Sequence, residues 1–221
     1  MRFDDLEIWD LNGDEDRVIR FPSDSPSKTT KTKIKKEKED EEEEAFDWKK
    51  EIKSFAITLL ITLAVVLFLK SYVIINANVP TGSMENEIMP GDNIIGNRLA
   101  YLKEGPERGD VIFFYFPDDE SQQYVKRVIG LPGETVTIIN GKIYIDDATE
   151  ALDEPYLKEE WTYNTGPFVF EIPEDCYLCM GDNRNRSADA REWMNPYVKR
   201  EKIIGKAIFT YFPFNHWGFV E

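Results

Sequence analysis

Residues 55–75 of this 221-residue chain read FAITLLITLAVVLFLKSYVII, and fourteen of these side chains are Phe, Ile, Leu or Val. As a helix rising about 1.5 Å per residue, the stretch would measure about 31 Å, which matches the hydrocarbon core of a bilayer. Lys70 opposes insertion, but it lies near the end of the stretch, where its ammonium can reach the interface. The run lacks the polar face that a helix on a soluble core requires. It therefore predicts a transmembrane helix rather than a buried core helix.

Basic residues flank the predicted span on one side. Lys49, Lys50 and Lys53 precede it, and the first basic residue beyond it is Arg98. The positive-inside rule therefore predicts a cytoplasmic N-terminus and an extracytoplasmic domain over residues 76–221. A cleaved signal peptide is disfavoured, because its leader would be about 54 residues long and no clean Ala-x-Ala site follows. We predict an uncleaved, single-pass anchor in the cell membrane.

The segment before the span, residues 1–54, is strongly charged. Residues 1–45 alone hold 9 basic and 15 acidic side chains. Such a segment buries too little apolar area to offset its ordering entropy, so we predict a largely disordered cytoplasmic tail. A docking motif among its few apolar residues is the alternative.

The composition of the whole chain excludes several classes of protein. A net charge of −15 argues against nucleic acid as the main partner, because phosphate binding needs a basic face. One His and two Cys leave no His-rich metal site and no disulfide framework. We therefore expect neither a metal nor another cofactor.

Beyond the span the pattern is mostly β. Short runs rich in Val, Ile, Phe and Tyr are separated by Gly and Pro. These runs are Asn93–Asn97, Val111–Phe116, Tyr124–Ile129, Thr135–Ile139, Lys142–Ile145, Phe168–Ile172, Tyr177–Met180 and Lys206–Phe212. Asn140-Gly141 between two of them predicts a tight hairpin, because a type I′ turn requires a positive φ at both central residues.

Three segments could carry chemistry. Val79-Pro80-Thr81-Gly82-Ser83-Met84 presents a Ser after a sharp turn, which is a candidate nucleophile, although most such Ser residues only form a turn. In the strand from Tyr124, alternation places Tyr124, Lys126 and Val128 on one face. A desolvated Lys126 could act as a base, whereas a solvated surface strand is the alternative. Residues 181–191, GDNRNRSADAR, form either a solvated loop or a hydrogen-bonded scaffold beside a site.

Together and in this order, these motifs resemble bacterial type I signal peptidase. The resemblance rests on PTGSM (80–84), RGDVIF (108–113), YVKRVIGLPGE (124–134) and GDNR with S-x-D-x-R (181–191), and it covers residues 55–213. It implies an antiparallel β-sheet catalytic domain anchored by one N-terminal transmembrane helix. It also implies a membrane-bound serine endopeptidase that cleaves signal peptides from exported preproteins at Ala-x-Ala sites with a Ser–Lys dyad.

The resemblance assigns roles residue by residue. Ser83 would be the nucleophile and Lys126 its general base, with Ser187 orienting the Lys amine. The Thr81 hydroxyl and the Ser83 backbone N–H would form the oxyanion hole. The expected substrate pockets are lined by Val79, Met84, Ile88, Tyr124 and Val125. Asp182, Asn183, Arg184, Asp189 and Arg191 would support the site, the last two as a salt bridge.

Some positions depart from the family pattern or stand outside it. Asn86 and Glu87 stand where the family usually has Pro and Thr, which puts the local loop shape in doubt. We expect Cys176 and Cys179 to be buried free thiols, since residues i and i+3 of a strand point to opposite faces. The aromatic C-terminus around His216 could cover the core or touch the membrane interface.

Two other functions are compatible with the sequence. One is a specialised processing peptidase for a dedicated secreted substrate. The other is a non-catalytic membrane scaffold of the same fold, which the presence of both Ser83 and Lys126 disfavours. The expected partners are preproteins and membrane lipid. The sequence does not specify the oligomeric state or the substrate repertoire.

Overall fold

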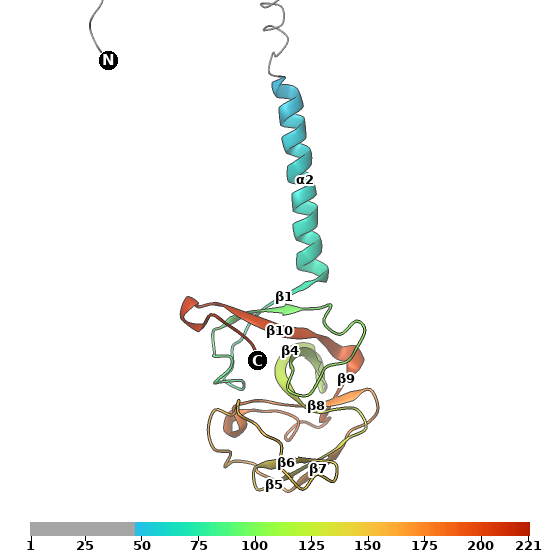
Figure 1. Cartoon of the computed structure of the whole chain (residues 1–221), viewed down its shortest axis with the longest axis vertical. Helices are drawn as coiled ribbons and strands as arrows, with labels where there is room; N and C mark the ends of the chain where they lie inside the picture. The colour runs from blue at the N-terminus through green and yellow to red at the C-terminus, as the bar shows by residue number, and fades with distance from the viewer. Residues whose placement is uncertain (1–46) are drawn as a thin grey trace, which may run out of the picture. The chain divides into compact units, whose positions relative to one another are not determined.

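The computed structural model describes residues 47–221. It contains one long helix, α2 (Trp48–Tyr72), followed by a domain of antiparallel strands (Figure 1). The predicted charged tail lies, up to residue 46, outside the described residues. The chain divides into two units at Ala56, inside α2.

Helix α2 begins at a capped end. The Asp47 side chain accepts hydrogen bonds from the backbone N–H groups of Lys49 and Lys50, at 3.1 and 3.3 Å, which satisfies donors that the first helical turn leaves free. The apolar run starts at Phe55, and the helix therefore starts seven residues before it, at Trp48. It is long and apolar enough to cross a membrane, and none of its residues is buried.

The helix also ends earlier than the apolar run. Ile74 and Ile75, which the sequence placed in the span, instead open strand β1 (Ile74–Asn78). The β-branched run from Val73 to Ile75 favours an extended backbone, and β1 pairs with β2 from Ile74 opposite Asn97. The division into tail, anchor and exported domain stays a prediction.

The larger sheet of the domain has the strand order β1-β2-β10-β3-β4-β8-β9, and β11 pairs with β10. Its strands are β1, β2 (Asn93–Asn97), β3 (Val111–Phe116), β4 (Asp119–Gly130), β8 (Cys176–Met180), β9 (Tyr197–Lys199), β10 (Ile203–Phe212) and β11 (Gly218–Phe219). Short 3-10 turns cover Arg184–Arg186, Arg200–Lys202 and Phe214–His216. The mostly β, antiparallel fold is thus confirmed.

A smaller sheet has the order β6-β5-β7 and lies at the far end of the domain from β1 in Figure 1. Its strands are β5 (Thr135–Ile139), β6 (Lys142–Ile145) and β7 (Phe168–Glu171). Asn140 and Gly141 turn between β5 and β6 with φ of 52° and 72°, so the predicted type I′ hairpin is confirmed. Residues 146–167, between β6 and β7, form a long irregular connection.

The core lies in three clusters of buried side chains. One joins the smaller sheet to β8 through residues such as Ile138 and Leu178. A second packs the β1–β2 loop against β3 and β10, and a third fills the opposite face of β3 and β4. The second and third clusters therefore fix the β1–β2 loop and β4 relative to each other.

Candidate active site

Ser83 lies in the loop between β1 and β2. The base of the loop is closed by two backbone bonds, from Val79 N to Asp92 O at 2.8 Å and from Gly91 N to Val79 O at 2.7 Å. Met84, next to Ser83, is 1% exposed and packs in the second cluster. The apolar side chain that follows the Ser therefore fastens the turn to the core.

Lys126 reaches the same point from β4. Its Nζ lies 2.6 Å from Ser83 Oγ, and both side chains are buried. Burial disfavours the charged ammonium and lowers the pKa of Lys126 from 10.5 to about 8, although the charge of Asp189 opposes the shift. A substantial fraction of the amine is therefore neutral near that pH and can accept the hydroxyl proton of Ser83.

The loop after β8 supports the pair as a hydrogen-bonded scaffold. Arg191 donates to both carboxylate oxygens of Asp189, at 2.7 and 2.8 Å, and the Gly181 N–H donates to Asp189 at 3.1 Å. A Cβ added at Gly181 would overlap both the Ser187 hydroxyl and the Ser83 carbonyl oxygen. The loop can therefore approach Ser83 only with Gly at position 181.

A second buried ion pair lies beside the Ser83–Lys126 pair. Arg127 Nε and Nη2 donate to the two carboxylate oxygens of Asp182, at 2.8 and 2.6 Å. The guanidinium also lies 4.1 Å from the centre of the Tyr156 ring. This pair ties β4 directly to the loop after β8.

The hydroxyl groups of Ser187 and Thr81, to which the resemblance gives roles, make no hydrogen bond within the described part of the chain. The Ser187 hydroxyl is buried beside Gly181 but has no hydrogen-bond partner there. Thr81 is exposed on the β1–β2 loop. The lysine-orienting role of Ser187 and the oxyanion role of Thr81 stay predictions.

The expected pocket residues fall into two groups. Val79, Met84 and Ile88 are buried in the second cluster, and Val125 packs against them. Tyr124 instead packs on the opposite face of β4, where its ring stacks on that of Phe116 with 4.5 Å between the ring centres. The predicted alternation of the strand is thus observed.

The 146–167 connection contributes side chains that sequence reasoning missed. Lys158 pairs with Glu85 of the β1–β2 loop, and Arg184 pairs with Glu154 at 2.5 Å. The backbone carbonyl of Tyr156 accepts a hydrogen bond from the Asn86 amide at 3.2 Å. No motif in the sequence marks these partners, because they are separated by up to 73 positions and join two different elements.

The departures at residues 86 and 87 have a structural consequence. Asn86 adopts a φ of 98°, which the fixed ring of Pro excludes. Glu87 accepts a hydrogen bond from the backbone N–H of Glu221 at 2.8 Å. The loop after Ser83 therefore takes a backbone path that the usual Pro does not permit.

The remaining chemical groups are accounted for by packing. Cys176 and Cys179 are buried free thiols, as expected. His216 Nδ1 lies 2.7 Å from the buried carboxylate of Asp92, which holds the C-terminal segment against the β1–β2 loop. Among the described residues, no group of three His, Cys, Asp or Glu could hold a metal ion.

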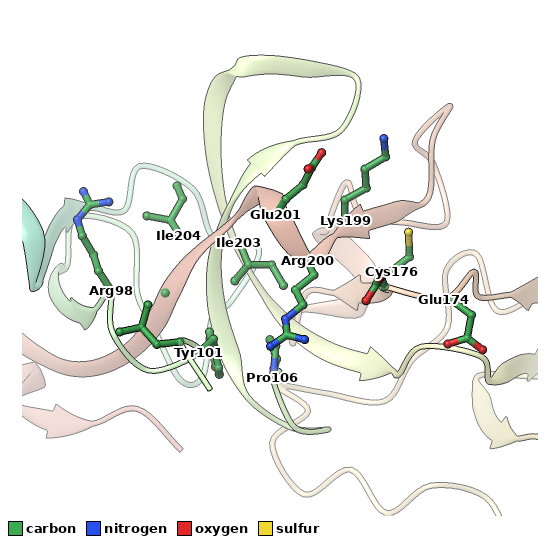
Figure 2. Close-up of a pocket in the computed structure, with 13 residues that line it drawn as sticks. Arg98, Tyr101, Pro106, Glu174, Cys176, Lys199, Arg200, Glu201, Ile203 and Ile204 are labelled. Atoms are coloured by element: carbon green, nitrogen blue, oxygen red, sulfur yellow. The ribbon is translucent and has the colours of Figure 1, made fainter. Parts of the chain in front are cut away.

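A cavity of about 740 Å³ lies elsewhere in the domain (Figure 2). Three basic and three acidic residues line it together with Tyr101 and Ile203. The charged residues are Arg98, Lys199, Arg200, Glu174, Asp175 and Glu201. None of the predicted site residues lines this cavity, so it is separate from the Ser83–Lys126 pair.

Comparison with known proteins identifies the family of the chain. Residues 52–212 match the family described as "Signal peptidase, peptidase S26". The chain therefore belongs to the signal peptidase family, and the resemblance drawn from its motifs is confirmed.

Two relatives match most of this chain, and one solved structure matches just under half of it. "Probable signal peptidase I-1" of Synechocystis sp. is 35% identical over 167 residues, which cover 72% of this chain and 82% of the relative. "Signal peptidase IB" of Staphylococcus aureus is 29% identical over 185 residues, which cover 76% of this chain and 94% of the relative. A signal peptidase I structure from Enterococcus faecalis is 33% identical, with a TM-score of 0.40, and covers 47% of this chain and 97% of its own.

Proposed function

We propose that this protein is a membrane-bound serine endopeptidase that removes signal peptides from exported preproteins, with Ser83 and Lys126 as its catalytic dyad. The observation that carries the proposal is the 2.6 Å contact between Ser83 Oγ and the buried Nζ of Lys126. A nucleophile within hydrogen-bond reach of a base whose pKa is lowered to about 8 is the arrangement that covalent catalysis needs. Family membership supports the same activity.

In the proposed reaction, Ser83 Oγ attacks the carbonyl carbon of the scissile peptide bond. Its proton passes to neutral Lys126, and the developing oxyanion accepts hydrogen bonds from the Ser83 N–H and the Thr81 hydroxyl. Lys126 then protonates the leaving amine, which departs as the new N-terminus of the exported chain. Water, deprotonated by Lys126, attacks the acyl-enzyme and releases the carboxylate of the signal peptide together with free Ser83.

The substrate-binding side of the proposal rests on the apolar group Val79, Met84, Ile88 and Val125. Side chains of this kind can accept the small residues of an Ala-x-Ala site and exclude large ones. The positive-inside pattern supports an exported domain, and α2 would hold enzyme and substrate in the same bilayer, which raises their effective concentration.

Cleavage of a preprotein by the full chain in detergent tests this function. Wild type should cut after the Ala-x-Ala sequence, as N-terminal sequencing of the product would show. Ser83→Ala and Lys126→Met should each lower kcat by a factor on the order of 10⁴ or more, whereas Lys142→Met, on the exposed side of β6, should not. Undiminished cleavage by either dyad variant would overturn the assignment.

A second substrate series separates general from dedicated processing. If the protein processes many preproteins, unrelated precursors with Ala-x-Ala sites should be cut at similar rates. Replacement of the residue before the scissile bond by a bulky one should abolish cleavage. Cleavage of a single precursor would instead support the specialised peptidase.

A further inference from the structure

Asn183 holds the peptide unit that precedes the proposed nucleophile. Its side-chain Nδ2 donates to Gly82 O at 2.9 Å, and its backbone N–H donates to Ser83 O at 3.1 Å. The Glu85 N–H donates to the same Gly82 oxygen at 3.2 Å. Two donors therefore fix the carbonyl of the Gly82–Ser83 peptide, and a third fixes the carbonyl that follows.

The direction of a carbonyl determines the direction of the N–H in the same peptide. The Gly82–Ser83 bond is not among the cis bonds of the described residues. In a planar trans peptide the C=O and the N–H point in opposite directions. Because Gly82 O points toward Asn183, the Ser83 N–H points the other way within the same peptide plane, on the opposite side of the C–N bond.

The Asn183 amide is itself held in one orientation. Its Nδ2 also donates to Glu85 Oε2 at 3.1 Å, and the Glu85 carboxylate pairs with Lys158. Both neighbours of Nδ2 are acceptors, so a flipped amide would place its oxygen against two other oxygens. Asn183 is 1% exposed, and water therefore has little access to replace these bonds.

We infer that Asn183 is a positioning residue that aims the Ser83 N–H at the oxyanion, and that Glu85 and Lys158 keep the Asn183 amide in its working orientation. The inference rests on the proposed function, because only an acyl-transfer reaction generates that oxyanion. Without the Asn183 amide, the Gly82 carbonyl would keep only the longer bond from the Glu85 N–H at 3.2 Å, and the weaker hold would let the peptide turn its N–H out of the hole. Asn183 touches no reacting atom and acts through the peptide unit alone.

The first test compares Asn183→Ala with wild type on an Ala-x-Ala peptide substrate. Loss of one oxyanion donor typically costs on the order of 10²-fold in kcat, and we expect a loss of that size with KM changed less than about threefold. An inhibitor with the same peptide sequence and a C-terminal aldehyde forms a tetrahedral adduct with Ser83 and needs the same hole. Its inhibition constant should therefore rise in step with the loss in kcat. Unchanged kcat, or a parallel rise in KM and the inhibition constant, would overturn the inference.

The second test keeps the inference falsifiable if Asn183→Ala does not fold. Glu85→Gln retains an oxygen that accepts from Asn183, whereas Glu85→Ala removes it. We expect kcat within about threefold of wild type for Glu85→Gln and about tenfold lower for Glu85→Ala. Equal kcat values for the two variants would contradict a role through the Asn183 amide.

Asn195 offers a control outside the site. Its exposed side chain accepts a hydrogen bond from the backbone N–H of Tyr197 at 3.2 Å. Asn195→Ala should retain wild-type kcat. If wild type cleaves and Ser83→Ala does not, yet Asn183→Ala cleaves like wild type, the inference alone fails. If wild type does not cleave, the proposed function fails.

Discussion

Lys126 is the residue whose pKa burial lowers most usefully for the proposed reaction. Its aliphatic stem lies in the β sheet, and its amine meets Ser83 with 4% of the residue exposed. Desolvation is the largest cause of its lowered pKa, and Asp189, Cys179 and Asp182 each oppose it. The nearby carboxylates thus favour the charged ammonium, but burial favours the neutral amine more strongly, and the net result is a lowered pKa.

This balance predicts a specific pH dependence of cleavage. Because only neutral Lys126 can accept the Ser83 proton, kcat/KM should fall about tenfold per pH unit below its pKa of about 8 and level off above it. The measurement is kcat/KM of the full chain in detergent from about pH 6 to about pH 9.5. Circular dichroism over the same range must show a folded domain. A profile that stays flat through pH 8 would contradict a titrating Lys base.

At the scale of elements, the site is assembled from the β1–β2 loop, β4, the loop after β8 and the 146–167 connection. The Arg127–Asp182 pair joins two of them, and its side chains are 2% and 0% exposed. The two groups satisfy each other through two parallel hydrogen bonds, the geometry in which an Arg–carboxylate pair is strongest. Removal of the Asp182 charge would leave the Arg127 guanidinium buried without its counter-charge, with only the carbonyl oxygens of Gly109 and Glu221 as acceptors.

Asp182→Asn should therefore destabilise the domain. Loss of one partner from a buried pair costs about 3–5 kcal/mol, which for a domain of this size lowers Tm by roughly 10 °C. Thermal unfolding of the full chain in detergent measures the shift. Glu120→Gln, which removes the partner of Lys202 in an exposed pair, is the control and should leave Tm unchanged. Equal Tm values for the two variants would contradict the argument.

The elements differ in how far the sequence predicts them. The β5–β6 hairpin was predictable because Asn140-Gly141 and the alternating runs determine it locally. Strand β1 was missed, since its first two residues continue an apolar run and only pairing with β2 separates them from the helix. The ion pair between Glu85 and Lys158 was also missed, because it depends on how the 146–167 connection folds back onto the β1–β2 loop.

Contacts within the predicted site were predictable where a motif carries them. Ser83 and Lys126 lie together, as do Asp189 and Arg191, which is the placement that the resemblance implied, and their roles stay predictions. The pocket residues share one apolar cluster except for Tyr124, which alternation along β4 had already placed on the opposite face from Val125. The partner of Arg127 was not predictable, because Asp182 lies 55 positions away on another element.

At the scale of the whole molecule, the central question is which side of the membrane holds the domain. Lys49, Lys50 and Lys53 lie before the apolar run, and no basic residue lies between Lys70 and Arg98. Basic residues near a span remain preferentially in the cytoplasm, so the domain should be exported. Cys179 is fully buried, whereas Cys176 is 9% exposed and lines the cavity of Figure 2, so the chain without an added cysteine is the background control for a labelling experiment.

Single cysteines on the two sides of α2 test the orientation directly. Lys103→Cys, on an exposed turn of the domain, should react with a membrane-impermeant maleimide in intact cells. Glu51→Cys, near the start of α2, keeps all three lysines and should react only after the membrane is permeabilised. Labelling of Glu51→Cys but not of Lys103→Cys in intact cells would show the opposite orientation and contradict the prediction. Replacement of the three lysines by Gln should then allow part of the population to insert the other way, because the charge difference that sets the orientation is gone.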